Sequence, residues 1–131
     1  MTDLSIGDLA ARFGIATHVL RHWEDMGLLS PRRDSGGRRR YSPADTETVG
    51  LILVAKRVGM SLDEIRALST ATADRESRRK LLRAHQDRLE EQIAWAQAAM
   101  ATIGHAADCT AENLRECPNF RALLARAVPE R

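Results

Sequence analysis

Residues 5–27, SIGDLAARFGIATHVLRHWEDMG, contain two short helical patterns with a small loop between them. Ser5 is a favourable N-cap residue, and Asp8 three positions later suits the positive end of a helix dipole. The apolar residues that follow recur on one helix face, and Gly14 ends the pattern. We therefore expect a first short helix that begins after Ser5 and ends at Gly14.

The second pattern starts at Thr17, a candidate N-cap, and ends at Gly27. Val19, Leu20 and Trp23 recur at helical spacing and are expected to face inward. Two short helices joined by so few residues predict a helix-turn-helix, whose second helix has the right size for a DNA major groove. An ordinary helical hairpin without a DNA role is the alternative.

An arginine-rich segment interrupts the helical pattern from Pro31 to Tyr41. The small residues at 34–37 (DSGG) predict a tight turn with a short extended arm on each side, and together these form a wing. Five arginines and one aspartate give the wing a summed charge of about +4, as expected for a surface that contacts phosphate. A solvated arginine-rich turn is the alternative. The five are Arg32, Arg33, Arg38, Arg39 and Arg40.

Two further helices are expected directly after the wing. Ser42 at an N-cap with Pro43 at the first helical position starts one that stops at Gly59. Ser61 caps the next, and the small polar residues at 70–74 form a hinge after it. This part of the chain therefore predicts a compact, mainly helical unit.

A longer helix with a coiled-coil seam is expected over residues 75–103. Its apolar positions alternate in steps of four and three, a pattern typical of coiled coils. Because a lone helix cannot bury this seam, we expect a second copy of the chain to cover it; packing on the chain's own N-terminal half is the alternative. Gly104 is expected to end this helix, and Pro118 to begin a last short one. The seam comprises Leu82, Gln86, Leu89, Ile93, Ala96, Met100 and Ile103.

The composition agrees with a small, mainly α-helical protein. The 131 residues are 44% hydrophobic, 29% charged and 4% aromatic, and a net charge of +2 is too small to indicate nucleic acid by itself. We find no signal peptide and no membrane-spanning run, so we expect a cytosolic protein without membrane contact. No serine–histidine–acid set, phosphate loop or paired catalytic carboxylates is visible, which argues against an enzyme.

The motifs SIGDLA (5–10), LRHWE (20–24), GLL (27–29), GRRRYS (37–42) and GMSLDEI (59–65) resemble the MerR family of bacterial transcription regulators. The resemblance implies a winged helix-turn-helix domain over residues 1–70, a dimerisation helix over 75–104, and an effector loop with a short helix over 105–131. It further implies a nucleoid-associated homodimer, held by an antiparallel coiled coil, that distorts promoter DNA for RNA polymerase.

By position, the resemblance implies a set of DNA contacts on the second helix and the wing. Arg39 is expected to touch the DNA backbone and to set affinity more than sequence choice. The family usually has aromatic residues where this chain has His22 and Arg38. The implied DNA-binding residues are Thr17, His18, Arg21, Trp23, Arg38, Arg39, Arg40 and Tyr41.

The chain has two cysteines, Cys109 and Cys117, in a loop after the long helical pattern. Where thiols are kept reduced, such a pair is more often metal-binding or redox-active than structural. Two thiolates suit a soft monovalent cation such as Cu(I). The spacing also resembles that of the family's copper-type sensors, which implies that the pair binds a metal effector.

Three other interpretations of the cysteine loop stay open. His105, Asp108 and Glu112 could complete a tetrahedral Zn(II) site with the thiols. Cys117, which precedes Pro118 at a helix start, could instead be an activated thiol that senses oxidants or electrophiles. Finally, the pair could simply be buried in a constitutive DNA-binding protein that takes no metal or other cofactor.

Overall fold

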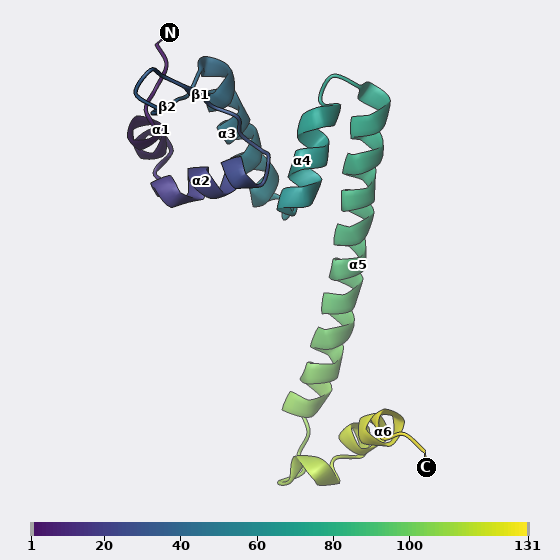
Figure 1. The fold of residues 1–131 in the computed structure, drawn as a ribbon. Coiled ribbons are helices and arrows are strands. Elements are labelled where there is room, and N and C mark those ends of the chain that lie inside the picture. The colour runs from purple at the N-terminus through teal and green to yellow at the C-terminus, as the bar shows by residue number, and fades with distance from the viewer. Residues whose placement is uncertain (1, 131) are drawn as a thin grey trace. The chain divides into compact units, whose positions relative to one another are not determined.

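The computed structural model describes residues 2–130. Met1, the first residue of the predicted DNA-binding domain, and Arg131, the last residue of the predicted effector region, lie outside the described residues. Figure 1 follows the chain from α1 to α6. Its internal contacts form two compact units, one that ends at His85 and one that begins at Gln86. Each unit is described by itself below. The boundary between them falls inside the longest helix, α5.

The first two helices form the predicted helix-turn-helix. Helix α1 spans Ile6–Phe13, and the Ser5 hydroxyl accepts a hydrogen bond of 3.1 Å from the Asp8 N–H. Gly14 ends it in the left-handed conformation, at φ 67°, as glycine does most readily. Helix α2 spans Thr17–Asp25, but its N-cap is Ala16. The expected cap at Thr17 was therefore wrong by one residue, because Thr17 already has helical geometry.

The wing consists of β1 (Arg32–Arg33) and β2 (Arg39–Arg40), which pair antiparallel. The Asp34 carboxylate accepts hydrogen bonds from the Arg38 N–H at 3.0 Å and the Gly36 N–H at 2.9 Å, which closes the turn. The bond from Arg38 is the main cause that lowers the pKa of Asp34. The wing also extends onto the N-terminal segment, because Leu4 and Tyr41 exchange two backbone hydrogen bonds of 2.8 Å.

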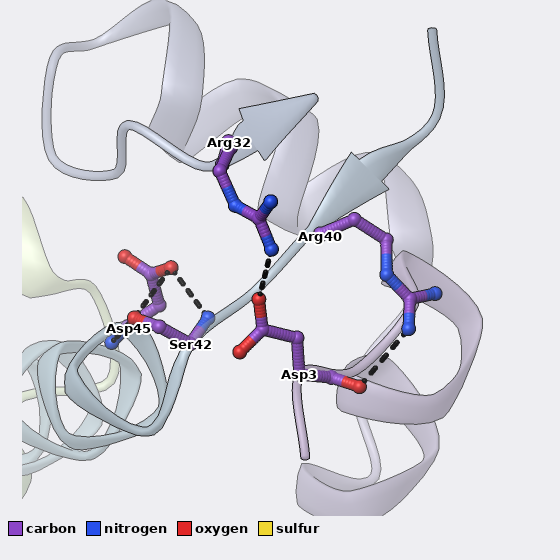
Figure 2. A network of polar contacts seen from close by, with 5 residues as sticks. All are labelled: Asp3, Arg32, Arg40, Ser42 and Asp45. Carbon is purple, nitrogen blue, oxygen red and sulfur yellow. Dashed lines mark hydrogen bonds and ion pairs between the residues drawn. The ribbon is translucent and has the colours of Figure 1, made fainter. Parts of the chain in front are cut away.

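Helices α3 (Pro43–Arg57) and α4 (Leu62–Ala71) begin at the predicted caps. Both start with a capping box, in which a serine and the acidic residue three positions later bond each other's backbone N–H groups. In the first box, the Asp45 carboxylate accepts from the Ser42 N–H at 2.8 Å (Figure 2). Ser42 and Ser61 are thus confirmed as N-caps.

Replacement of Ser42 with alanine is expected to lower the free energy of unfolding by about 1 kcal/mol, the usual effect of losing an N-cap oxygen. The Asp45 N–H, which now donates to the Ser42 hydroxyl at 3.2 Å, would lose its partner. Urea unfolding followed by circular dichroism measures the change. Ser35→Ala, at an exposed turn position, is the matched control and should stay within about 0.5 kcal/mol of wild type.

The core of the first unit lies between these four helices and the wing. Most inward-facing positions expected from the helical periodicity are buried, among them Leu9, Leu20 and Ile52. Tyr41, expected as a surface residue, is also buried, with 0% of its surface exposed. The buried cluster comprises Leu9, Ala10, Leu20, Trp23, Leu28, Leu29, Tyr41, Val49, Ile52, Ala55, Met60, Ile65 and Leu68.

The long helix α5 spans Arg75–Ala107, followed by a 3-10 turn (η1, Leu114–Glu116) and α6 (Pro118–Ala127). Gly104 does not end α5, because its backbone stays helical and the helix continues for three more residues, which include two alanines. A glycine inside a helix costs only about 1 kcal/mol, which good helix formers on either side can offset. Pro118 does begin the last helix. No helix within residues 2–130 is long and apolar enough to cross a membrane.

Candidate nucleic-acid interface and thiol pair

Helix α2 presents a polar surface made of residues expected to contact DNA. His18 and Arg21 are exposed, while Thr17 is half-buried. The Arg21 guanidinium donates to the Thr17 hydroxyl at 3.5 Å, a long and weak hydrogen bond. Arg21 therefore stays available to a new acceptor, such as a phosphate or a base edge.

Glu24 of α2 holds two wing arginines. Arg39 Nε lies 2.6 Å from Glu24 Oε2, and Arg33 Nη2 lies 3.7 Å from Glu24 Oε1. The hydrogen bond to Glu24 is the main cause that raises the pKa of Arg39, so this guanidinium stays charged. The side chains of Arg39 and Glu24 are each 24% exposed. The ion pair thus fixes Arg39 between the wing and α2, the helix expected to enter the DNA major groove (the recognition helix).

Asp3 holds two more wing arginines from the N-terminal segment (Figure 2). Its carboxylate lies 2.7 Å from Arg32 Nη2, and its backbone carbonyl accepts from Arg40 Nη2 at 3.2 Å. Arg38 is exposed on the wing and belongs to neither of these networks. Asp3 and Glu24 were missed in the sequence because their partners lie 29 and 15 residues away, beyond any local pattern.

Trp23 and Tyr41 were expected to contact DNA, but the structure places both in the core. Their exposed fractions are 2% and 0%, so neither side chain offers a surface to a ligand. The Tyr41 hydroxyl has no hydrogen-bond partner within residues 2–130, and burial is the main cause that raises its pKa. We therefore expect both residues to support the recognition helix and the wing from within the core, instead of contacting DNA directly.

The seam of α5 is largely exposed in the single chain. Leu82, Ile93, Met100 and Ile103 expose 44%, 58%, 72% and 67% of their surface, respectively. Ala96 is exposed and Leu89 is half-buried. Trp95, which lies outside the predicted seam, is 73% exposed. An exposed apolar face of this kind is typical of a surface that a binding partner buries.

The two cysteines lie together in the second unit. Both cysteines are free, and their thiols lie close enough to influence each other's titration. The interaction between the thiols is the main cause that lowers the pKa of Cys117 and raises the pKa of Cys109. The backbone at Phe120 and Asn119, at the start of α6, also contributes to the lowered pKa of Cys117. Charge on the pair is therefore favoured on Cys117, which is only 1% exposed.

His105 and Asp108 do not join the thiols in a metal site. Within residues 2–130, no group of three or more His, Cys, Asp or Glu side chains is placed to hold one metal ion. His105 instead lines a cavity of about 400 Å³ between the end of α5 and α6, together with Phe120 and Leu123. The tetrahedral zinc alternative therefore lacks its ligands within the described chain.

A winged helix-turn-helix followed by a long helix and a short C-terminal helix defines the class of helix-turn-helix regulators. The chain belongs to the MerR family: the family described as "MerR HTH family regulatory protein" matches residues 4–72. A second one, described as "MerR, DNA binding", matches residues 46–106. The proteins of this family are transcription regulators and not enzymes.

Three similar proteins illustrate the range of the family. The chain is 34% identical over 102 residues to the transcriptional activator TipA of Streptomyces coelicolor, covering 73% of this chain but only 40% of TipA. It is 28% identical over 121 residues to heavy metal-dependent transcription regulator 2 of Rhizobium meliloti, covering 88% and 82% of the two chains. The solved structure of PbrR691 of Ralstonia metallidurans with lead(II) is 25% identical, with a TM-score of 0.73 and coverage of 92% and 98%.

Proposed function

We propose that this chain is a promoter-binding regulator that works as a homodimer and senses a thiophilic metal ion through Cys109 and Cys117. In this proposal the exposed face of α5 is buried by the same face of a second copy. The dimer distorts its operator in the cytoplasmic nucleoid, where RNA polymerase uses the promoter. The observation that carries the metal assignment is the proximity of the two free thiols, each of which shifts the pKa of the other.

The α5 face supports the dimer. Its seam repeats in coiled-coil steps, and four of its large apolar members, Leu82, Ile93, Met100 and Ile103, are exposed in the single chain. Two copies place two recognition helices and two wings on one duplex, as symmetric regulators do. Arg21 and the wing arginines supply the positive charge that such a complex needs.

The donor set fits a soft monovalent ion. Two adjacent sulfurs can bind Cu(I) without further ligands, and thiolate ligands favour Cu(I) among the available metals. The neighbouring Cys109 thiol, together with the backbone at the start of α6, lowers the pKa of Cys117, which favours its thiolate form as a ligand. Zn(II) would need two more ligands that the described residues do not place near the pair. The similarity to a heavy metal-dependent regulator supports a metal effector, without selecting among metals.

Thiol redox sensing is the second candidate. The same contact would let the Cys117 thiolate attack an oxidised Cys109, for example a sulfenic acid made by a peroxide, which would expel hydroxide and leave a disulfide. The lowered pKa of Cys117 favours this step as well. A constitutive regulator without an effector is the third candidate.

Metal titration of the reduced dimer tests the proposal. We expect one Cu(I) per chain in competition with a chelator, and at least about a hundredfold weaker binding of Zn(II). Cys109→Ala/Cys117→Ala should bind no Cu(I) and should give the same promoter output with and without copper. Cys109→Ser removes one sulfur only. It should weaken Cu(I) binding, because the remaining Cys117 sulfur leaves the ion without its second ligand.

His105→Ala is the matched control, because it changes a possible ligand near the loop that does not touch the thiols. It should bind Cu(I) like wild type. A double cysteine variant whose operator binding and promoter output match those of wild type under both copper and peroxide would refute sensing and favour the constitutive alternative. A response to peroxide alone would favour redox sensing instead.

A further inference from the structure

Helix α5 contributes one buried side chain to the first unit, that of His85. Of the residues that the structure describes in α5, His85 is the only buried one, and 5% of its surface is exposed. Its helix neighbours Ala84 and Gln86 are both exposed. A polar ring in this position needs partners for both of its nitrogen atoms.

The His85 ring contacts both ends of the turn between α3 and α4. Nε2 donates to the Val58 carbonyl oxygen at 2.7 Å, because a carbonyl can only accept. Nδ1 lies 3.4 Å from Glu64 Oε2. Val58 is the C-cap of α3, and Glu64 is the acidic member of the capping box that starts α4. One imidazole ring thus joins α5 to the end of α3 and to the start of α4.

Helix α3 connects this contact to the wing. Its C-cap, Val58, is held by His85, while its N-cap, Ser42, directly follows β2 and Tyr41. Val49 and Ile52 are buried at 0% exposure in the middle of α3, so the helix packs tightly in the core of the first unit. Because packed cores shift between discrete arrangements rather than bending, we expect α3 to shift as a whole if it moves.

We propose that His85 is the positioning residue that couples movement of α5 to the DNA-binding unit. Through the same contact, DNA binding would alter α5 and the thiol loop that follows it. The inference rests on the proposed function, since it assumes operator DNA at one end and a sensing thiol pair at the other. Coupling between two binding sites is reciprocal. If an effector at the thiol loop changes the affinity for DNA through this contact, DNA binding changes the affinity of the loop for that effector by the same factor, and we expect the surroundings of the cysteines to change with it.

The test follows the surroundings of the cysteines directly and needs no metal. The reduced full chain is mixed with a duplex that the protein itself selects from random-sequence DNA, and the rate of Cys109 and Cys117 alkylation by iodoacetamide is followed by mass spectrometry. In wild type, saturating duplex should change the alkylation rate by about fivefold or more, the lower end of typical allosteric coupling. In His85→Phe, which keeps the ring volume but has no N–H, the change should fall below about 1.5-fold.

Three further variants separate coupling from folding. His85→Gln keeps a donor for the Val58 carbonyl and should recover part of the effect. Glu64→Gln keeps a capping residue at α4 but removes the charge beside Nδ1, so it tests the contact even if His85→Phe does not fold. Gln92→Ala, at an exposed position of α5 outside the seam, is the control and should behave as wild type.

Each outcome bears on one of the two proposals. Lost coupling in His85→Phe, with circular dichroism and duplex affinity within about threefold of wild type, supports the relay. A duplex effect of wild-type size in both His85→Phe and Glu64→Gln overturns it, as does the absence of any effect in wild type. A wild-type chain that binds no Cu(I) but shows the duplex effect would refute metal sensing and leave the relay standing.

Discussion

Trp23→Ala is expected to lower the free energy of unfolding of the first unit by about 3–5 kcal/mol, a large part of the roughly 5–15 kcal/mol typical of a domain. Trp23 is 2% exposed and belongs to the main buried cluster, so alanine would leave a cavity below the recognition helix. Lys56 Nζ also lies 6.0 Å from the ring centroid, a cation–π contact that the variant would lose. Urea unfolding followed by circular dichroism measures the change.

The neighbouring position provides the control for Trp23. His22→Ala, at an exposed site on the same helix, should change stability by less than about 0.5 kcal/mol. Trp23→Phe distinguishes a packing role beneath α2 from a direct DNA contact, because phenylalanine fills most of the core volume but lacks the indole N–H. If Trp23 supports the helix from beneath, Trp23→Phe should keep operator affinity within about threefold of wild type. A tenfold or larger loss in a folded Trp23→Phe variant would restore Trp23 as a DNA contact.

The fold was predictable because its signals are local. An N-cap and its acidic partner lie three residues apart, so Ser5, Ser42 and Ser61 could be found by reading the chain. The DSGG turn at 34–37 is equally local, and it fixed the place of the wing. Errors arose where two local rules compete. Gly104 is a helix-ending residue by preference, but strong helix formers carry α5 past it.

The site was predictable only in part, because several of its contacts join distant residues. That Glu24 pairs with Arg39, and Asp3 with Arg32, depends on how α2, the wing and the N-terminus meet. The burial of Tyr41 likewise follows from packing rather than from its position in an arginine-rich segment. The thiol pair was found as a pair because its members are close in the sequence. That negative charge is favoured on Cys117 rather than Cys109 could be inferred only from the three-dimensional position of the Cys117 sulfur at the start of α6.

Arg39→Ala is expected to weaken operator binding by about a hundredfold or more at physiological salt, since hydrogen bonds to charged groups are worth about 1.5–3 kcal/mol each and a dimer loses two of them. The dependence of affinity on salt should weaken as well. Each lost phosphate contact lowers the slope of log K against log salt by about 0.9, so the dimer should lose about 1.8. Fluorescence anisotropy with a labelled duplex, at salt concentrations from about 50 to about 200 mM, measures both the affinity and the salt slope.

Two variants separate the phosphate contact from general charge. Arg126→Ala removes the same charge from α6, in the other unit, and should leave affinity and slope close to wild type. Arg39→Lys keeps the charge but loses the planar fork that now pairs with Glu24, so affinity should fall while the slope stays near that of wild type. Because Glu24 already holds Arg39 in one position, little side-chain freedom remains to be lost when DNA binds. An Arg39→Ala dimer with wild-type affinity and slope would show that the wing does not contact the backbone through this residue.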